Sequence, residues 1–384
     1  MKYTDNTEPS DQFRLWTAIA TVGAALERRV WLNWENTTYC NMFIVIVGSA
    51  GHSRKGTAMK PAKRLLSKLG VNLAAESMTR EALIKRLSNT STAMPQVQLA
   101  TGQFTQPHAS LTIWSEEWTV LIGYNNQILM ADLNNLYDCP DTWLYETKMS
   151  GIFPIENVWL HMYAATTPQL LQTTLPQDSF GGGLTSRTVF VCQMARGKLV
   201  MFPIQTAKEK AMETQLIEDL KNIHDLHGAF SFTEEFARLY VEWRYGHEKN
   251  PPFMNTVLES YSARRQTHLI KLAMILCAAR CNDMILLPQD IKRAATILTK
   301  TEENMLIPFR GIGRSDYAAI TNRMMGIIFT KKAVTRREIT KLMWQDATET
   351  EIDAVLQTLI IMEFIEVPTS DVHNTYIKLK EPKE

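Results

Sequence analysis

The chain has 384 residues with an apolar fraction of 45%, and its 41 Lys and Arg residues balance 40 Asp and Glu residues to a net charge of +1. This length predicts two or three globular units at the usual ~150 residues each, and the composition excludes a disordered or fibrous protein. Because the charges balance, the protein as a whole does not attract nucleic acid electrostatically, so binding to nucleic acid would need local basic patches.

The first half of the chain alternates helix and strand signals. Apolar residues recur at helical spacing over residues 13–32, and the continuously apolar run of residues 42–47 predicts a strand buried on both faces. Helices are predicted over residues 57–69 and 79–87. Further strands are predicted at residues 111–114, 158–165 and 188–192. Alternation of this kind is typical of a parallel α/β sheet, doubly wound or nucleotide-binding.

The second half of the chain changes to helical signals. Helices with no intervening strand are predicted at residues 207–224, 231–245, 266–280 and 288–299. Ser231 and Glu234 have the spacing of a capping box, which would fix one helix start. Residues 308–314 then indicate a linker or hinge.

A small unit is predicted after this linker. Its signals are a helix over residues 316–330, capping boxes at residues 335–338 and 348–351, and strands at residues 364–367 and 375–379. The second capping box precedes a helix with apolar residues in register. Three helices followed by a β-hairpin predict a winged helix.

The loop between the first buried strand and its helix is rich in glycine and leads to a lysine. A phosphate placed there would meet free backbone amides, the positive end of the helix and the Lys55 ammonium. The loop departs from the motif G-x-x-x-x-G-K-[ST], because one extra residue precedes Lys55 and Gly56 replaces the metal-binding hydroxyl, which Thr57 would supply instead. The candidate phosphate-binding residues are Gly48, Gly51, Ser53, Arg54, Lys55, Gly56 and Thr57. The alternative is a basic glycine loop without function.

The second predicted strand of this set ends in two carboxylates, Glu116 and Glu117. Beside a phosphate loop, one acid would hold Mg²⁺ directly or through water, and the other would polarise the water that attacks a γ-phosphate. We assign the metal to Glu116 and the water to Glu117, although the two roles could be exchanged. The alternative is a solvated loop, so the pair matters only together with Lys55.

Two further signals lie along the third and fourth strands. Thr166 and Thr167 end the third strand and would hydrogen-bond the γ-phosphate or the attacking water; a turn cap is the simpler alternative. A glycine segment leads to Arg187 before the fourth strand, and arginine is suited to stabilising the charge of a transferring phosphate. A local salt bridge is the alternative for this arginine.

Taken in order, the segments RKGT, SEEW, AATTP and GGGLTSRTVFV resemble the P-loop ATPase domain of phage and mobile-element replication proteins. These proteins are relatives of AAA+ helicases of the MCM-like and superfamily 3 kind and often lie beside or fused to primases. The resemblance covers roughly residues 10–300. It implies an AAA+-like α/β core that binds ATP and Mg²⁺ and carries a helical lid. The expected organisation is an N-terminal helical segment (1–35), the P-loop core (36–205), the lid (206–306) and the winged helix (315–384).

The resemblance also implies a role for each candidate residue. Lys55 and Thr57 would bind phosphate and metal, with Glu116 and Glu117 as the acidic pair and Thr166 or Thr167 as the sensor. Arg187 would be a finger that reaches into a neighbouring subunit's site. A lid helix would place Arg264 or Arg265 on the nucleotide, and a solvated helix start is the alternative for these two.

The resemblance implies a homo-oligomeric ring, expected to be a hexamer, that threads single- or double-stranded DNA. Lys148, near the tip of a hairpin predicted within residues 141–156, would face the central pore; a solvated lysine is the alternative. In the C-terminal unit the basic cluster that would meet the DNA backbone is Lys331, Lys332, Arg336, Arg337 and Lys341. Acidic residues around it make a protein contact a serious rival. The sequence shows no primase-like acidic site or zinc motif, so if priming is needed, a separate protein would supply it.

Cysteine usage and hydropathy favour a reducing, aqueous compartment. The 5 cysteines are sparse and odd in number, and the Cys277 and Cys281 pair is better explained as buried thiols than as a metal site. The polar N-terminus has no apolar segment of signal-peptide type, and no apolar run is long enough to cross a bilayer. We expect a cytoplasmic protein, in a bacterium or a virus-infected cell, without a membrane partner.

The sequence therefore predicts an ATP-dependent DNA helicase or translocase of phage or mobile-element replication. One alternative is a nucleotide-binding protein that recognises an origin or operator through its winged helix, with weak or no unwinding. A second alternative is a degenerate P-loop that serves only as scaffold.

Overall fold

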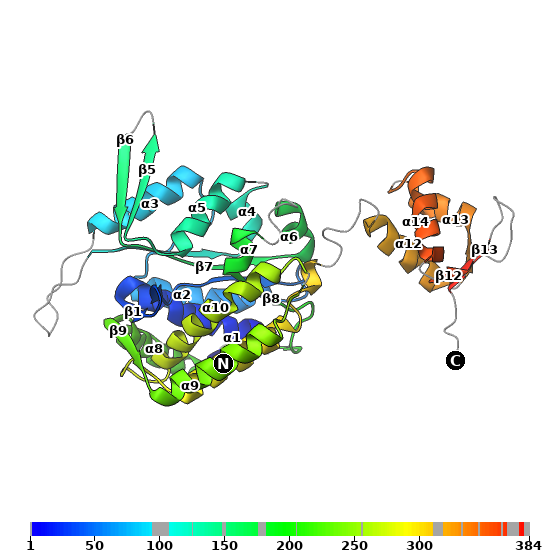
Figure 1. Ribbon diagram of the computed structural model, residues 1–384. Helices are drawn as coiled ribbons and strands as arrows, with labels where there is room; N and C mark the ends of the chain where they lie inside the picture. Colours follow the sequence, from blue (N-terminus) through cyan, green and yellow to red (C-terminus); the bar gives the residue numbers. More distant parts are fainter. Residues whose placement is uncertain are drawn as a thin grey trace, which may run out of the picture. The chain divides into compact units, whose positions relative to one another are not determined.

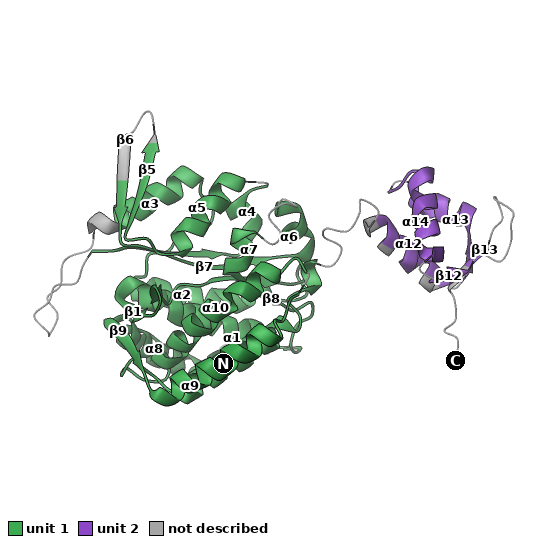
Figure 2. Cartoon of the chain, in the orientation of Figure 1, with its two compact units in different colours: residues 1–310 green, residues 311–384 purple. Residues whose placement is uncertain are grey.

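In the computed structural model the chain divides into two compact units, residues 1–310 and residues 311–384 (Figure 2). The structure describes residues 2–93, 107–124, 126–147, 151–175, 182–204, 206–254, 256–309, 318–331, 333–344, 346–361, 364–366 and 376–379. Each unit has its own core. Within these ranges no helix combines the length and the hydropathy that crossing a membrane requires.

A parallel sheet forms the centre of the first unit. Its strands are β3 (Phe43–Val47), β4 (Ala109–Ser115), β7 (Val158–Thr166) and β8 (Thr188–Cys192). They lie in the order β4-β7-β3-β8 and all neighbours are parallel, which confirms the predicted α/β class. Every residue in these strands is buried, because helices cover both faces. All four strands end at one edge, here called the carboxyl edge, and begin at the opposite, amino edge.

Helices from both halves of the chain cover this sheet. On one side of β7 lie α3 (Arg80–Ala93), α4 (Trp118–Ile122) and α5 (Gln127–Tyr137), and on the other lie α1 (Asp11–Leu26) and α2 (Lys55–Leu69) (Figure 1). Short helices α6 (Pro168–Thr174) and α7 (Gly183–Arg187) connect β7 to β8. The later helices are α8 (Ala207–His224), α9 (Glu234–Lys249), α10 (Glu259–Ala278) and α11 (Pro288–Glu302).

A second, smaller sheet corrects two predictions. The first helix does not run to residue 32 but ends at Leu26, and the next residues form β1 (Val30–Asn33) after a short 3-10 helix (Glu27–Arg29). Strands also interrupt the helical second half, where none were predicted. The sheet has the order β10-β9-β1-β2, with β2 (Thr37–Tyr39), β9 (Gly228–Phe232) and β10 (Ile285–Leu286). These strands are too short to show a period of two, and they pair with segments far away in sequence.

One capping box is also wrong. Ser231 lies in β9, and the cap of α9 is Thr233, whose hydroxyl accepts the Phe236 amide at 3.3 Å. Pairing of Ser231 with β10 takes the residue out of the helix start.

The predicted hairpin before β7 is confirmed as antiparallel β5 (Thr142–Thr147) and β6 (Gly151–Glu156), which project from the body of the first unit (Figure 1).

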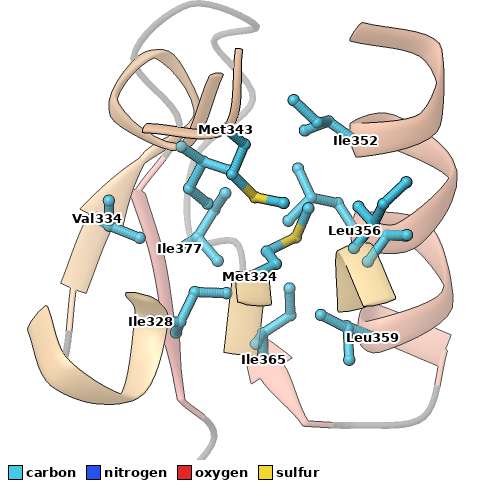
Figure 3. Close-up of a cluster of buried hydrophobic side chains, with 12 residues drawn as sticks. Met324, Ile328, Val334, Met343, Ile352, Leu356, Leu359, Ile365 and Ile377 are labelled. Atoms are coloured by element: carbon cyan, nitrogen blue, oxygen red, sulfur yellow. The ribbon is translucent and has the colours of Figure 1, made fainter. Parts of the chain in front are cut away.

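The second unit contains three helices and a three-stranded antiparallel sheet. Its elements are α12 (Ala318–Lys331), β11 (Ala333–Thr335), α13 (Arg336–Met343), α14 (Glu349–Ile361), β12 (Ile365–Glu366) and β13 (Tyr376–Leu379). The predicted hairpin is confirmed as β12 and β13, while β11 was not predicted. Met324, Ile328, Met343, Ile352 and Ile377 meet in the apolar core between the helices and the sheet (Figure 3). Both predicted capping boxes are present, at Thr335 and at Thr348.

Candidate functional site

The loop between β3 and α2, residues 48–54, is held by its neighbours at the carboxyl edge. The Gly48 amide donates to the Thr166 carbonyl at the end of β7 (3.2 Å), and the Ser49 hydroxyl donates to the Met194 carbonyl beyond β8 (2.7 Å). A Cβ atom on Gly48 would lie 2.4 Å from a backbone oxygen of the segment after β8, so only glycine fits there. The β3–α2 loop is therefore tied to both strands that flank β3.

Inside the loop, turn geometry brings the chain to the start of α2. The buried Ser53 hydroxyl donates to the Ser49 carbonyl at 2.8 Å. Gly51 and Arg54 both adopt left-handed backbone, with φ of +66° and +58°. Because Arg54 gives the helix no side-chain cap, the first amides of α2 depend on another acceptor. Free amides at a helix start are a common anion-binding feature.

Lys55 is the first residue of α2, and its side chain folds back over the loop. Its Nζ donates to the Gly48 carbonyl at 2.7 Å and to the Ser49 carbonyl at 3.2 Å. Burial of the side chain lowers the pKa of Lys55, and the negative charge of Glu117 opposes that shift. The partners of the ammonium are neutral oxygens, and hydrogen bonds to an ionised phosphate are stronger than bonds to these.

The two predicted acids reach this helix start from β4. A Cβ atom on Gly56 would lie 2.8 Å from Oε2 of Glu116, so the Glu116 carboxylate rests against the first turn of α2. Burial raises the pKa of Glu117, and the charge of Lys55 opposes that shift. The Glu117 amide donates to the Ser115 hydroxyl at 3.3 Å, which shapes the turn after the strand. The structure thus brings both acids to the β3–α2 loop.

The two threonines at the end of β7 differ in their surroundings. Thr166 is buried beside the loop, because β7 lies between β3 and β4 and its carbonyl accepts the Gly48 amide. Thr167 caps α6, with its hydroxyl accepting the Leu170 amide at 3.3 Å. Thr167 therefore acts as the turn cap, and Thr166 is the better placed of the two to meet a ligand at the loop.

A residue that the sequence did not single out also holds the loop. Glu8 pairs with Arg54 at 2.7 Å and with Arg196 at 3.5 Å, and it accepts the Val200 amide at 3.3 Å. This last bond and the two arginines hold the pKa of Glu8 below its usual range. No sequence signal could have found it, because Glu8 lies in a polar N-terminal segment without a motif.

The other predicted arginines, Arg187, Arg264 and Arg265, are held in ion pairs away from this loop. Thr188 pairs with Phe43 at the start of β3, so Arg187 is at the amino edge, about 16 Å of strand away at ~3.3 Å per residue. Arg187 donates to Asp138 at 2.6 Å, and Arg264 approaches the same carboxylate at 3.5 Å. Arg265 is buried in a bidentate ion pair with Glu302, with both distances 2.7 Å, among α9, α10 and α11.

The start of α2 offers one carboxylate, that of Glu116, as an oxygen ligand for a divalent cation. Position 56 is where the motif would place a metal-binding hydroxyl, and the Glu116 carboxylate lies against it instead. Mg²⁺ prefers oxygen ligands and is usually held by one or two carboxylates together with substrate phosphates. Thr57 is exposed on the same turn. The described residues hold no group of three or more His, Cys, Asp or Glu side chains suited to a metal ion.

Two residues of the basic cluster of the second unit, Lys331 and Arg336, are paired with acids. Arg336 bonds Asp353 at 2.8 Å and Glu349 at 3.1 Å, and Lys331 lies 3.8 Å from Glu338. Arg337 and Lys341 are exposed beside a shallow pocket of about 290 Å³. Lys148 and Lys332 lie outside the described residues.

In the first unit, Cys277 is a buried free thiol and Cys281 is half-buried.

No protein-family model matches this chain, and no curated protein matches its sequence.

Proposed function

We propose that the chain is an ATP-driven DNA helicase or translocase of phage or mobile-element replication, with a P-loop core of AAA+ type in the first unit. The observation that carries this proposal is the meeting of Lys55, Glu116 and Glu117 at the carboxyl edge of a parallel sheet. In open α/β sheets, ligands bind outside the carboxyl ends of the strands. A lysine and two carboxylates at a helix start supply charge of both signs for a metal-bound triphosphate.

The loop residues would bind the phosphates in this mechanism. Lys55 exchanges its carbonyl partners for β- and γ-phosphate oxygens, and the first amides of α2 donate to the same group. When bound, Mg²⁺ neutralises phosphate charge and orients the triphosphate. Glu116 would hold the ion from its position against Gly56.

Glu117 would orient and deprotonate the attacking water. Its raised pKa makes it a stronger base than an exposed carboxylate, and the nearby Lys55 keeps the ionised form accessible. Thr166 would hydrogen-bond the water or the γ-phosphate from the strand between β3 and β4. These roles assign the reaction to residues of three adjacent strands.

Arg187 would act on the nucleotide of a second copy of the chain. Its place at the amino edge separates it from its own β3–α2 loop by the length of β3, a strand of 5 residues. An arginine supplied by a neighbour stabilises the charge of the transferring phosphate. We therefore propose a homo-oligomeric ring, a hexamer by resemblance, with ATP at the subunit interfaces.

Contacts with DNA are proposed for both units. The second unit would be a winged helix in which the exposed Arg337 and Lys341 meet phosphates, since Arg336 is already paired with two acids. In the first unit the projecting β5–β6 hairpin would line the pore of the ring. If priming is needed, a separate primase would supply it.

Hydrolysis and unwinding assays on the purified full chain test this proposal. We expect Mg²⁺-dependent ATP hydrolysis stimulated by single-stranded DNA, unwinding of a forked duplex, and an oligomer in native mass measurements with ATP. Binding of ATP without turnover, combined with gel shifts on one specific duplex, would instead favour the origin- or operator-recognition alternative. Absence of ATP binding would leave the loop as scaffold.

The Gly56 and Glu116 pair gives a prediction on metal binding. A serine at position 56 would place its Cβ against Oε2 of Glu116, and the flexible carboxylate would swing away from the metal position. We expect Gly56→Ser to weaken Mg²⁺-dependent nucleotide affinity by about tenfold or more, which corresponds to about 1.4 kcal/mol. Titration calorimetry with ADP, with and without Mg²⁺, measures this change.

Shortening the acid should restore the metal site. The double variant Gly56→Ser with Glu116→Asp supplies a hydroxyl and a shorter carboxylate, so we expect it to recover most of the lost affinity. Gly246→Ser is the matched control, because Gly246 lies in α9 with no atom within 4 Å of an added Cβ. Equal losses in the single and double variants would contradict the assignment of Glu116 to the metal.

A further inference from the structure

A pocket lies at the amino edge of the sheet, opposite the β3–α2 loop. It has a volume of about 570 Å³, within the ~300–1,000 Å³ typical of small-molecule sites. Residues of β2, the end of α5, α9 and α10 line it, as does Asn41 just before β3. We call it the amino-edge pocket. Nothing in the proposed ATP site uses it.

The amino-edge pocket is lined by a buried cation, Lys271, that forms no ion pair within the described residues, although the charge of Asp138 acts on it. Lys271 is 4% exposed, and its Nζ donates to Oδ1 of Asn41 at 2.5 Å and lies 4.2 Å from the centre of the Tyr137 ring. The Asn41 amide is fixed because its Nδ2 donates to two carbonyls, those of Tyr137 and Leu160. Burial lowers the pKa of Lys271 to about 8. A buried ammonium of this kind is stabilised by an anion.

The tyrosine whose ring packs on Lys271 carries a buried hydroxyl without a partner in the described part of the chain. Tyr137 is 1% exposed, it lines the pocket, and its OH makes no hydrogen bond within the described part of the chain. Burial also raises the pKa of this phenol, so it remains a proton donor. Buried polar atoms in proteins are rarely left unpaired, and a phosphate or carboxylate oxygen in the pocket would accept this proton.

The mouth of the amino-edge pocket adds a further cation. Arg264 lines it, and the Asp138 carboxylate that Arg264 approaches is bonded more closely by Arg187, at 2.6 Å against 3.5 Å. Among the described residues that line the amino-edge pocket, the acidic ones are Asp138 and the exposed Glu35. As long as Arg187 stays on Asp138, Arg264 can turn to an anion in the pocket without leaving Asp138 unpaired.

Aromatic side chains form the outer wall of the pocket. Trp34 and Tyr240 meet edge to face with ring centres 5.0 Å apart, and Tyr39 lies on β2 beneath the Arg28 guanidinium. Trp34 and Tyr240 are half-buried, so parts of both rings remain accessible. Aromatic faces of this kind stack on nucleobases with little preference for sequence.

We propose that the amino-edge pocket binds a nucleoside phosphate, as a second nucleotide site separate from the β3–α2 loop. The phosphate would accept hydrogen bonds from Lys271, the Tyr137 hydroxyl and Arg264, and the base would pack on Trp34 and Tyr240. Lys271 and the unpartnered Tyr137 hydroxyl favour an anionic group in the ligand. The rings of Trp34 and Tyr240 favour a planar group, such as a nucleobase. This proposal stands whether or not the loop binds ATP.

Calorimetric titration of AMP into the Lys55→Ala variant tests the second site in isolation. We expect one site per chain, weakened about tenfold or more by Lys271→Met, which keeps the side-chain volume, and weakened less by Tyr137→Phe. Lys292→Met, on the exposed face of α11, is the control and should leave AMP affinity unchanged. Melting curves of each variant verify that the chain is folded.

Two further readouts separate this proposal from its rivals. Above about pH 8, free Lys271 loses its proton, so AMP affinity should fall with rising pH in the Lys55→Ala background and stay flat there after Lys271→Met. Adenosine and inorganic phosphate should each bind more weakly than AMP. The proposal is overturned if AMP binds equally well to folded Lys271→Met and Tyr137→Phe, or if phosphate alone matches AMP.

Discussion

Replacement of Lys55 by alanine is expected to weaken ATP binding at the β3–α2 loop by about a hundredfold or more in affinity, equivalent to about 2.8 kcal/mol. The ammonium is the positive side chain positioned over the β3–α2 loop, where it bonds two carbonyls at 2.7 and 3.2 Å. Without it, a triphosphate would depend on helix amides and the metal alone. ATP hydrolysis should fall to background in the same variant.

The fold should survive this change. Lys55 makes its hydrogen bonds to loop oxygens, and burial already lowers the pKa of its ammonium, so removal relieves a partly desolvated charge. Lys60→Ala is the matched control, because Lys60 is exposed on the same helix. Calorimetry with ADP and Mg²⁺, together with thermal melting, measures both effects. If folded Lys55→Ala keeps the Mg²⁺-dependent ADP affinity of the wild type, the proposed mechanism is removed.

The second large effect is expected for Glu117→Gln. Nucleotide affinity should change little, since the amide keeps the size of the side chain, while the hydrolysis rate should fall about 10²–10⁴-fold because the general base is lost. Single-turnover hydrolysis and a separate binding titration distinguish the two parameters. Glu81→Gln, on the exposed surface of α3, serves as the control.

The pH dependence of the wild-type rate provides an independent check on Glu117. Burial raises the pKa of this carboxyl, and the base acts only when ionised, so the rate should fall as pH drops through the raised pKa. Glu116→Gln should weaken metal dependence instead. If Glu116→Gln shows intact binding with lost turnover while Glu117→Gln does not, the two acids have exchanged roles.

The large central sheet was readable from the sequence, and the small sheet was not. Runs such as residues 42–47 are continuously apolar, and such runs form strands when helices cover both faces of a sheet. In contrast, residues 30–32 continue the apolar spacing of α1 and become β1 only by pairing with β9, nearly two hundred residues later. Local secondary-structure propensity carries no information about so distant a strand partner. For the same reason the prediction of Ser231 as a helix cap was wrong, because Ser231 pairs with Ile285 of β10 instead.

The candidate site, like the fold, has parts that the sequence predicted and parts that it did not. The loop and the acids were found because each follows a buried strand, and parallel strands end at a common edge. The meeting of Arg187 and Arg264 at Asp138 had no sequence signal, nor had the burial of Arg265 against Glu302. Such ion pairs join separate helices, so their formation depends on how the helices pack.

The sequence by itself determined the α/β class, the buried strands and the residue types at their carboxyl ends, because burial of apolar runs and the chemistry of strand-to-helix loops are local properties. The tertiary structure decided that Glu116 lies against Gly56, that Arg187 and Arg264 meet at Asp138, and that Lys271 and Tyr137 line the same pocket. These depend on distances between segments far apart in the chain, which only packing fixes.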